Sequence, residues 1–244
     1  MTAPQSKTQI DRLGDRLRAE PPTASDLELL DEHRRSFRTA YDIVVGVIRD
    51  RLGLEATGRP AKSTGSIVEK LRRETIRLSQ VQDIAGCRVV VGGVVEQERA
   101  VASLRQAFAG ADVVDRRANP SYGYRAVHVI VRESGKLVEV QVRTALQHLW
   151  AELSEKFSDV IHPDLKYGGG PEVALRFLMG LSQQVARTEE FQVALASLQA
   201  RFPRAAALDP ELQGLRRRAA ETEEGLRRDM NEFISRLSEL KGKR

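Results

Sequence analysis

The order of hydrophobic and polar residues predicts helices in the N-terminal part of the chain. Residues 6–19 form a short polar helical pattern that ends at residues 20–22, where two consecutive prolines cannot continue a helix. Residues 25–52 carry apolar positions at helical spacing and predict one long helix. Residues 53–65 are rich in Gly, Pro, Ser and Thr and predict a loop.

A helix with a basic face is predicted after this loop. Ser66 and Glu69 have the spacing of a capping box, so the helix should begin near Ser66. Lys70, Arg73 and Arg77 recur on the same face as Ser66. That face is either a solvated helix surface or a binding surface for anions.

The middle of the chain shows the shorter apolar runs of strands. Residues 84–92 form a continuous apolar run, which is typical of a strand buried on both faces. The runs 124–132 and 136–143 are separated by three residues, as in a β-hairpin. A helix over 94–109 and a short strand over 112–116 complete this part of the prediction.

Helices are predicted again in the C-terminal part. Thr144 is a suitable N-cap for a helix with a clear apolar stripe. Beyond residues 168–171 the pattern is helical to the end of the sequence, with breaks near Pro203 and Pro210.

The composition indicates which classes of partner and which cellular compartment to expect. Lys and Arg number 39 against 34 acidic residues, and a pI near 9.5 favours a polyanionic partner such as a nucleotide, a nucleic acid or an acidic membrane. No apolar run is long enough to span a bilayer, and the N-terminus lacks the apolar core of a signal peptide. The single cysteine, Cys87, cannot form an intramolecular disulfide. We therefore expect a cytoplasmic protein.

The strand predicted over 136–143 alternates strictly between two kinds of residue. Three valines face one way, whereas Glu139, Gln141 and Arg143 face the other. A half-buried strand with three polar residues on one face is costly unless that face lines a wet site. The alternative is an edge strand with a solvated face, and the alternation alone leaves both open.

Asp83 stands at the start of the apolar run 84–92. An acidic residue at this place is either a turn or cap residue, or a functional carboxylate. If Asp83 and Glu139 lie on neighbouring strands, they suit Mg²⁺, which takes one or two carboxylates together with water and substrate phosphates. We hold this pairing as a hypothesis.

The basic helix and the loop before it are dense in groups that bind phosphate. Lys62 lies in the loop that leads to the helix N-terminus at Ser66, where free N–H groups and the helix dipole attract anions. For Lys62 and Lys70 we favour a phosphate-binding role. For Arg73 and Arg77 we favour a solvated helix face.

Tyr124 and His128 are four residues apart on a predicted strand, so they should share a face. A tyrosine beside a basic residue could stack on a purine ring, because aromatic faces bind bases with little geometric demand. The alternative is that both residues are packed in the core or at the edge of the sheet.

Four segments, taken in order, resemble the consecutive motifs of the RelA/SpoT homologue family, and most closely its synthetase-only small alarmone synthetases. They are RPAKSTGSIVEKL, DIAGCRVVV, SYGYRAVHVIV and VEVQVRTALQHLWAEL, and they span roughly residues 59–157. The resemblance implies an α/β (α+β) fold, with a nucleotidyltransferase-like mixed β-sheet flanked by helices and a helical C-terminal extension. It also implies transfer of the β,γ-pyrophosphate of ATP to the 3′-hydroxyl of GDP or GTP.

The resemblance further assigns roles to single residues. Asp83 and Glu139 match the catalytic acids that bind Mg²⁺, and Glu139 would activate the 3′-hydroxyl, either as general base or through the metal. The residues that match the ATP site are Arg59 and Arg88 on the adenine, and Lys62, Ser66 and Lys70 on the phosphates. The residues that match the acceptor-nucleotide site are Tyr124, His128, Gln141 and Arg143.

Two features depart from the family pattern. Arg59 and Lys62 are three residues apart, which is one more than usual, and segment 151–171 differs from the ending of the commonest small synthetases. Toxin-like relatives use adenine nucleotides or tRNA 3′ ends as acceptor, and they remain an alternative. A non-catalytic nucleotide- or RNA-binding module is a further alternative, against which the presence of both Asp83 and Glu139 argues.

The expected organisation has three parts. N-terminal helices occupy 1–52, the synthetase domain occupies 53–167 and a helical extension occupies 168–244. The His-Asp motif of the hydrolase domain found in bifunctional family members does not occur, so we expect synthesis without hydrolysis.

Apolar residues of the last helix recur at spacings of four, three, four and three, as in a coiled-coil seam. The repeat is too short to be stable as an isolated helix, so it must be buried against another surface. The resemblance favours a homo-oligomer, most simply a tetramer, and the alternative is packing within the same chain. The seam residues are Leu226, Met230, Phe233, Leu237 and Leu240.

Overall fold

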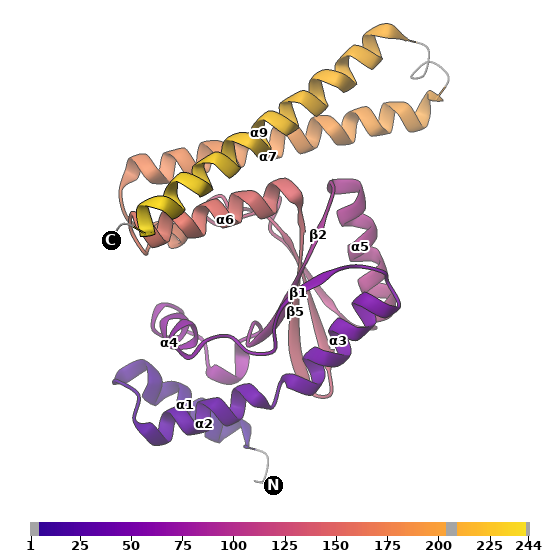
Figure 1. The fold of residues 1–244 in the computed structure, drawn as a ribbon. Coiled ribbons are helices and arrows are strands. Elements are labelled where there is room, and N and C mark those ends of the chain that lie inside the picture. Colours follow the sequence, from indigo (N-terminus) through magenta and orange to yellow (C-terminus); the bar gives the residue numbers. More distant parts are fainter. Residues whose placement is uncertain (1–4, 204–208, 243–244) are drawn as a thin grey trace. The chain divides into compact units, whose positions relative to one another are not determined.

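Two compact units make up the computed structural model of the chain, which describes residues 5–203 and 209–242 (Figure 1). The units are interleaved along the sequence, and the expected division into three consecutive parts stays a prediction. Unit 1 consists of the residues up to Val89, Val101–Val114 and His128–Gln141, and unit 2 consists of Val90–Ala100, Asp115–Val127 and the residues from Val142 onward.

A five-stranded β-sheet has the strand order β1-β2-β5-β4-β3, with β1 antiparallel to β2. Strand β5 is therefore the central strand, so the alternative of an edge strand with a solvated face is wrong. With its flanking helices the sheet confirms the expected fold class. The strands are β1 (Ala56–Arg59), β2 (Ala85–Val91), β3 (Asp112–Asp115), β4 (Val127–Glu133) and β5 (Lys136–Thr144).

Two strand predictions need correction. Strand β1 lies within the stretch predicted as a loop, because its short, Gly-containing sequence is held by backbone pairing with β2 rather than by apolar side chains. Strand β2 is not buried on both faces. Ala85, Cys87 and Val89 are buried, whereas Gly86 and Arg88 on the other face are only partly covered.

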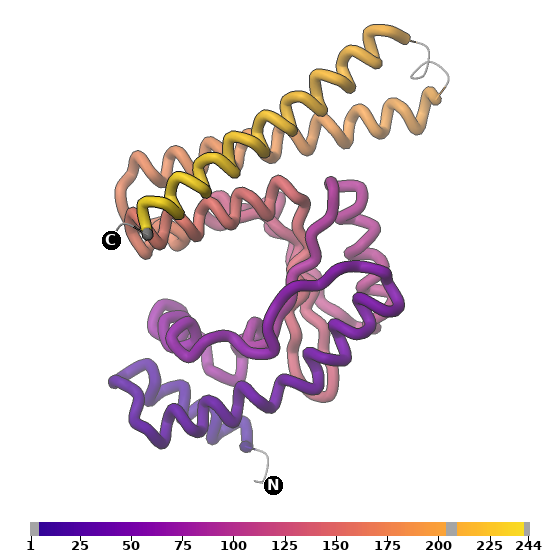
Figure 2. The backbone as a smooth tube through the Cα atoms, viewed as in Figure 1, coloured from indigo at the N-terminus to yellow at the C-terminus, as the bar shows by residue number. Residues whose placement is uncertain are grey.

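The N-terminal region contains three helices, α1 (Lys7–Ala19), α2 (Ala24–Arg35) and α3 (Arg38–Asp50), as the tube in Figure 2 shows. The prediction of one long helix over 25–52 is wrong. Ser36 ends α2 because its hydroxyl donates a hydrogen bond of 2.6 Å to the carbonyl oxygen of His33. This bond satisfies a carbonyl that a continuing helix would use.

Helix α4 (Thr64–Arg73) begins earlier than predicted. Ser63 is its N-cap and accepts a hydrogen bond from the backbone N–H of Ser66, so the capping box predicted from Ser66 and Glu69 is wrong. The helix also ends before Arg77, which is exposed and lies just before the short 3₁₀ helix η1 (Leu78–Gln80). The basic face of α4 is therefore shorter than the sequence suggested.

The stability of unit 1 should depend on pH through His33. This imidazole is 5% exposed, and burial, together with the charge of Lys136, lowers its pKa from 6.5 to about 4. The unfolded chain binds a proton on His33 below about pH 6.5, whereas the folded chain binds it only near pH 4. The free energy of unfolding should therefore decrease by about 3 kcal/mol as the pH falls from 6.5 towards 4.

Urea unfolding at a series of pH values measures this dependence. The difference in free energy of unfolding between the protein and a His33→Gln variant isolates the contribution of His33 from that of the other titrating groups. We expect this difference to change between pH 6.5 and 4 and to be constant above pH 7. A difference that is the same at every pH would show that His33 titrates normally in the fold.

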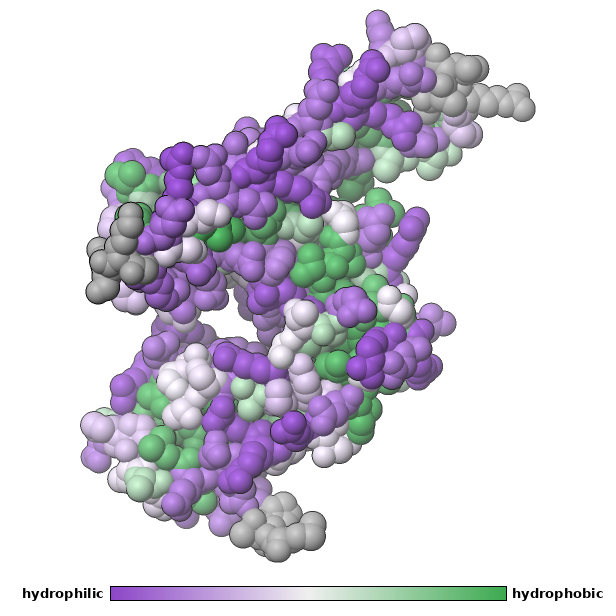
Figure 3. Space-filling view, viewed as in Figure 1, coloured by the Kyte–Doolittle hydropathy of each residue, from purple (hydrophilic) through white to green (hydrophobic). Residues whose placement is uncertain are grey.

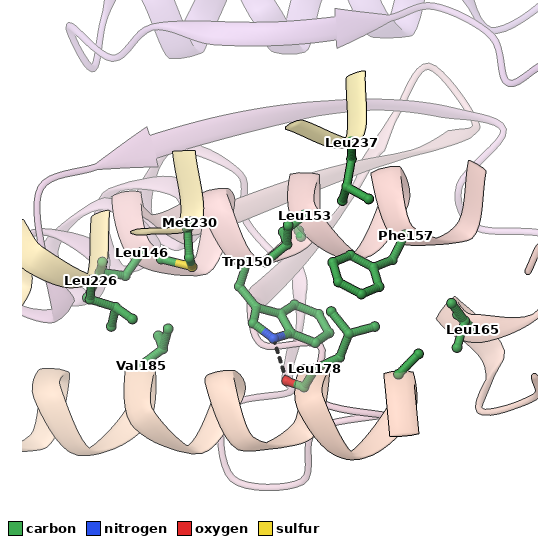
Figure 4. Close-up of a cluster of buried hydrophobic side chains, with 12 residues drawn as sticks. Leu146, Trp150, Leu153, Phe157, Leu165, Leu178, Val185, Leu226, Met230 and Leu237 are labelled. Atoms are coloured by element: carbon green, nitrogen blue, oxygen red, sulfur yellow. Dashed lines mark hydrogen bonds between the residues drawn. The ribbon is translucent and has the colours of Figure 1, made fainter. Parts of the chain in front are cut away.

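Unit 2 is built around three packed helices, α6, α7 and α9. Helix α6 begins at the predicted N-cap Thr144, whose hydroxyl accepts a hydrogen bond from the N–H of Gln147. The indole of Trp150 lies at the centre of the buried cluster and donates a hydrogen bond of 2.8 Å to the carbonyl of Leu178 (Figure 4). The remaining bounds are α5 (Val94–Ala107), α6 (Ala145–Val160), η2 (Leu165–Tyr167), α7 (Glu172–Arg201) and α9 (Pro210–Gly242).

The predicted seam on α9 is largely used within the chain. Leu226, Met230 and Leu237 are buried in the cluster formed with α6 and α7. Phe233 is 40% exposed and Leu240 is 53% exposed, and the side of α9 visible in Figure 3 is mostly hydrophilic. The alternative of packing within the chain therefore holds for three of the five seam residues, and the oligomer stays a prediction.

Across the described part of the chain, no helix combines the length and the apolar character that a membrane span requires.

Candidate active site

Asp83 lies just before β2 and is held by two lysines. Its carboxylate is 2.6 Å from Nζ of Lys62 and 2.9 Å from Nζ of Lys70. Burial alone would raise the pKa of Asp83, but the charges and hydrogen bonds of the two lysines outweigh it and lower the pKa. Asp83 is therefore an ionised, positioned carboxylate, and the reading as a simple turn residue does not account for its partners.

Glu139 lies on the central strand β5 and has two polar partners of its own. Nδ1 of His128 on β4 is 2.9 Å from Oε1 of Glu139, and Nε2 of Gln141 donates a hydrogen bond of 2.6 Å to Oε2. Burial opposes ionisation of Glu139, but the hydrogen bonds from His128 and Gln141 more than compensate, so that its pKa is lowered. Glu139 is thus ionised although it is only 9% exposed.

Asp83 lies just before β2, which is the neighbour of the strand β5 that carries Glu139. The two carboxylates are close enough for the charge of Asp83 to disfavour ionisation of Glu139. Gly86 on β2 is what allows the strands to approach here, because a Cβ at this position would lie 3.0 Å from the carbonyl oxygen of Glu139. Two ionised carboxylates that interact in this way suit the oxygen-ligand preference of a divalent cation.

Two arginines share the face of the sheet that carries Glu139. In the antiparallel register Arg59 is paired with Gly86, and Thr57 is paired with Arg88. Paired residues of antiparallel strands point to the same side, and so do residues two apart on one strand. Arg59 and Arg88 therefore flank Gly86 on one face, and the position of Gly86 next to Glu139 shows that this is the face of the carboxylate.

The N-terminus of α4 lies beside the lysines. Lys62 directly precedes the N-cap Ser63, and its backbone N–H donates a hydrogen bond of 2.6 Å to the carbonyl of Ile84. This bond ties the loop to the segment that carries Asp83. The hydroxyl of Ser66 is 2.8 Å from that of Ser63 in the first turn. Lys62 and the first turn of α4 thus occur together, and Lys70, from the last turn, reaches the same carboxylate as Lys62, which is an arrangement that suits phosphate.

A second group of predicted site residues lies in unit 2. Nη2 of Arg143 donates a hydrogen bond of 3.0 Å to the hydroxyl of Tyr124, and its guanidinium lies 5.0 Å from the centre of the Tyr124 ring. Arg143 therefore already forms a cation–π contact with the tyrosine. A purine that stacks on Tyr124 would use the other face of the ring or displace the guanidinium.

The prediction that Tyr124 and His128 share a strand face is wrong. Strand β4 begins only at Val127, and Tyr124 lies in the preceding turn, where it forms an isolated bridge with Ser121. His128 is a partner of Glu139 in unit 1, whereas Tyr124 is a partner of Arg143 in unit 2.

The turn that carries Tyr124 is fixed by side chains of α6 and α7. Gly123 has a φ of +90°, and a Cβ there would lie 2.7 Å from Cζ2 of Trp150. The hydroxyl of Ser182 donates a hydrogen bond of 2.6 Å to the carbonyl of Gly123 and accepts one of 3.1 Å from Nε of Arg125. Only glycine fits this position without strain, so the turn is held in one place.

A buried polar network supports the strand end that carries Arg143. Glu189 of α7 accepts hydrogen bonds from the hydroxyl of Thr144 and from Nε2 of Gln147, the latter at 3.0 Å. Nε2 of Gln97 in turn donates bonds of 2.8 Å to Oε1 of Gln147 and to the carbonyl of Val142. These bonds hold Val142 and Thr144, the residues directly before and after Arg143, and so restrict the backbone of Arg143.

Comparison with known proteins identifies the family. A family model described as a region found in RelA/SpoT proteins matches residues 58–158. The GTP pyrophosphokinase YjbM of Bacillus subtilis is 32% identical over 186 residues, covering 69% of this chain and 82% of that protein. The chain belongs to the RelA/SpoT family.

Other RelA/SpoT relatives agree with this assignment. The small alarmone synthetase 1 of Bacillus subtilis, solved with its product pppGpp, has a TM-score of 0.52 and 25% identity, covering 68% of this chain and 97% of that one. An uncharacterized protein of Mycobacterium tuberculosis is 36% identical over 178 residues. That match covers 69% of this chain and 64% of the relative, so the chain spans less than two thirds of the mycobacterial protein.

The residues of this RelA/SpoT chain fit a magnesium ion. Among the described residues, no group of three or more His, Cys, Asp or Glu is arranged to hold a metal alone. Asp83 and Glu139 nevertheless supply two ionised oxygen ligands, and Mg²⁺ usually takes the rest from water and substrate phosphates.

The single cysteine of the chain, Cys87 on β2, is buried. Burial, followed by the charge of Glu139, raises the pKa of its thiol to about 12, so the thiol is neutral and not a nucleophile.

Several features of this site were missed in the sequence. His128 pairs with Glu139 because β4 and β5 are neighbours in the sheet, and the order of strands cannot be predicted from local sequence pattern. The need for Gly86 could have been read from a glycine inside an apolar strand, because such a glycine often marks a close backbone approach. Tyr122, 56% exposed in the same turn as Tyr124, is a further aromatic near the predicted acceptor residues.

Proposed function

We propose that the chain transfers the β,γ-pyrophosphate of ATP to the ribose 3′-hydroxyl of GDP or GTP. The observation that carries this proposal is a pair of ionised carboxylates, Asp83 just before β2 and Glu139 on the neighbouring β5, the first held by two lysines and the second by a histidine. The family relationship to a GTP pyrophosphokinase supports the same reaction. A bond forms between the 3′-oxygen and the β-phosphorus, the bond from that phosphorus to the α,β-bridging oxygen breaks, and AMP leaves.

The donor nucleotide would bind to unit 1. Lys62 and Lys70 would turn from Asp83 to the phosphates of ATP, with the N-terminus of α4 and the Ser66 hydroxyl adding hydrogen-bond donors. The planar guanidinium groups of Arg59 and Arg88, on one face of the sheet, suit stacking on adenine. Until substrate binds, the positive charges of the two lysines would balance the negative charge of the ionised Asp83.

Glu139 would act on the acceptor hydroxyl. Its lowered pKa makes it a weak base that is fully ionised at neutral pH, so its contribution is to accept the hydroxyl's hydrogen bond and then its proton as the new bond forms. His128 and Gln141 hold the carboxylate in position for this step. Mg²⁺, when bound by Asp83 and Glu139, would neutralise the charge that develops on the phosphates.

The acceptor nucleotide would be held by the residues around Tyr124. The partly exposed ring of Tyr124 would be the stacking platform for a purine, and the guanidinium of Arg143, which contacts this ring in the structure, would turn to a phosphate or a base edge of the nucleotide. His128 and Gln141, as partners of Glu139, would place the 3′-hydroxyl.

Substitution of either lysine should weaken the use of ATP. Lys62→Ala or Lys70→Ala is expected to raise the KM for ATP about tenfold to a hundredfold, because each removes a charge-assisted hydrogen bond to phosphate. The KM for the acceptor should change little. Arg73→Ala on the same helix is the control, since Arg73 pairs with Glu74 rather than with Asp83. Unchanged ATP affinity in both variants would show that the two lysines do not bind ATP and that the basic face of α4 is an ordinary solvated surface.

Product analysis with labelled ATP tests the proposed function. The protein is incubated with Mg²⁺, γ-labelled ATP and, separately, GDP, GTP, ADP or deacylated tRNA, and the products are separated by chromatography. The proposal predicts label in a guanosine tetra- or pentaphosphate. Label in an adenosine product or in tRNA would show that the chain transfers pyrophosphate to a different acceptor. Absence of transfer to all four acceptors would contradict the enzymatic proposal and leave only a role in binding.

A further inference from the structure

A pocket in unit 1 shares no residue with the candidate active site. It is formed where α1 and α2 meet the β4–β5 hairpin and the segment around η1. Phe37, Val81 and Leu137 provide apolar walls. A pocket with apolar walls and a few converging polar groups is the usual form of a small-molecule site.

One buried polar atom in this pocket has no hydrogen-bond partner among the described residues. It is Nε2 of His33, a residue that is only 5% exposed. Ser79 also lines the pocket, and its backbone N–H donates a hydrogen bond of 3.1 Å to the carboxylate of Asp11. Leaving a buried polar atom unpaired costs about 1–3 kcal/mol, so the imidazole of His33 indicates a missing partner.

The charge of the pocket is positive. Lys7, Arg132 and Lys136 line it, and no carboxylate is among its described lining residues. Asp11, which is bound to the N–H of Ser79 and interacts with Lys7, is an acidic neighbour of the pocket. Nζ of Lys136 lies 4.8 Å from the centre of the Phe37 ring, and burial lowers the pKa of this lysine. A partly buried cation without a carboxylate partner gains from a bound anion.

We propose that this pocket binds a small phosphorylated ligand, with its phosphate between Lys7, Arg132 and Lys136. The imidazole of His33 gives a hydrogen bond to a phosphate oxygen, and Phe37 and the neighbouring apolar walls contact the rest of the molecule. Three cations match the charge of a phosphate dianion better than that of a single carboxylate. A free phosphate and a phosphorylated metabolite share this chemistry.

Calorimetric titration of the full chain with phenyl phosphate and with inorganic phosphate, without Mg²⁺, tests the proposal. We expect a saturable site that Lys136→Gln weakens at least about tenfold, the effect of losing a charge-assisted hydrogen bond. Lys7→Gln, at an exposed position of α1, is a second variant that should weaken binding without affecting the fold. Tighter binding of phenyl phosphate would point to a phosphorylated metabolite, and equal binding would point to the free anion.

Two control variants separate this pocket from other cationic surfaces. Lys62→Gln, at the proposed ATP site, and Arg38→Gln, at an exposed position of α3, should leave the affinity unchanged. Binding that is lost in Lys62→Gln but kept in Lys136→Gln and Lys7→Gln would overturn the proposal. So would the absence of saturable binding of either compound up to about 10 mM, a concentration that detects even very weak sites.

Discussion

Glu139→Gln and Asp83→Asn are each expected to lower the rate of pyrophosphate transfer by about a hundredfold or more, with the fold retained. Both substitutions keep the size of the side chain and remove its charge. Glu139→Gln takes away the carboxylate that would accept the hydroxyl proton, and Asp83→Asn takes away the partner of Lys62 and Lys70. Each variant also removes one of the two ionised carboxylates that are proposed to bind Mg²⁺.

The measurement combines turnover with a readout that does not depend on activity. Initial rates are compared at saturating ATP and acceptor, and Mg²⁺ binding in the presence of ATP is followed by calorimetry. Glu69→Gln, an exposed carboxylate on α4, is the control and should keep normal rates. If a folded Glu139→Gln or Asp83→Asn variant turned over at a near-normal rate, the assignment of the site would be wrong.

Tyr124→Ala is expected to weaken binding of the acceptor nucleotide by about 1–3 kcal/mol and to leave ATP binding nearly unchanged. The ring is the stacking platform in the proposed acceptor site, and its turn is fixed by Gly123 and Ser182. Loss of the ring therefore removes the stacking surface without changing the residues of unit 1 that would bind ATP. Calorimetry with each nucleotide on the folded variant gives the two affinities.

Tyr124→Phe separates the ring from its hydroxyl. The phenylalanine keeps the stacking face and loses only the hydrogen bond from Arg143, so it should bind the acceptor within a few-fold of the original protein. Equal losses of ATP and acceptor affinity in Tyr124→Ala would contradict a specific acceptor role. A loss in Tyr124→Phe as large as that in Tyr124→Ala would assign the effect to Arg143 rather than to stacking.

The sequence predicted those parts of the fold that depend on local pattern. Strand β5 was evident from the strict alternation of its valines with Glu139 and Gln141, and the start of α6 from the N-cap Thr144. These features are set by side chains within a few residues of one another. Asp83 and Glu139 are far apart in the sequence, so their pairing was a hypothesis that the resemblance to the family motifs supported, and the structure shows that β2 and β5 are neighbours.

Features that depend on distant contacts could not be predicted in this way. The break between α2 and α3 arises from one hydroxyl, that of Ser36, which competes for a helix carbonyl in a sequence that is otherwise helical. Strand β1 exists because β2 offers it a backbone partner. The seam on α9 repeats like a coiled coil, yet the same repeat serves equally well to bury Met230 against helices of its own chain.

The site shows the same limit. His128 belongs with Glu139 and not with Tyr124, because β4 begins after the turn that carries the tyrosine. Periodicity along one strand placed the two residues on one face, but residues 125 and 126 have no regular structure, so the alternation of β4 does not extend back to Tyr124. Strand boundaries, rather than residue types, were therefore the weak point of the prediction.

The most direct test of the account is the stoichiometry of the reaction with GDP. The protein is incubated with Mg²⁺, ATP and GDP, and AMP, ADP and guanosine tetraphosphate are quantified over time. The account predicts that AMP and guanosine tetraphosphate appear in equal amounts and that neither appears with Glu139→Gln. Formation of ADP without AMP would show transfer of a single phosphate and would contradict pyrophosphate transfer as the function of this chain.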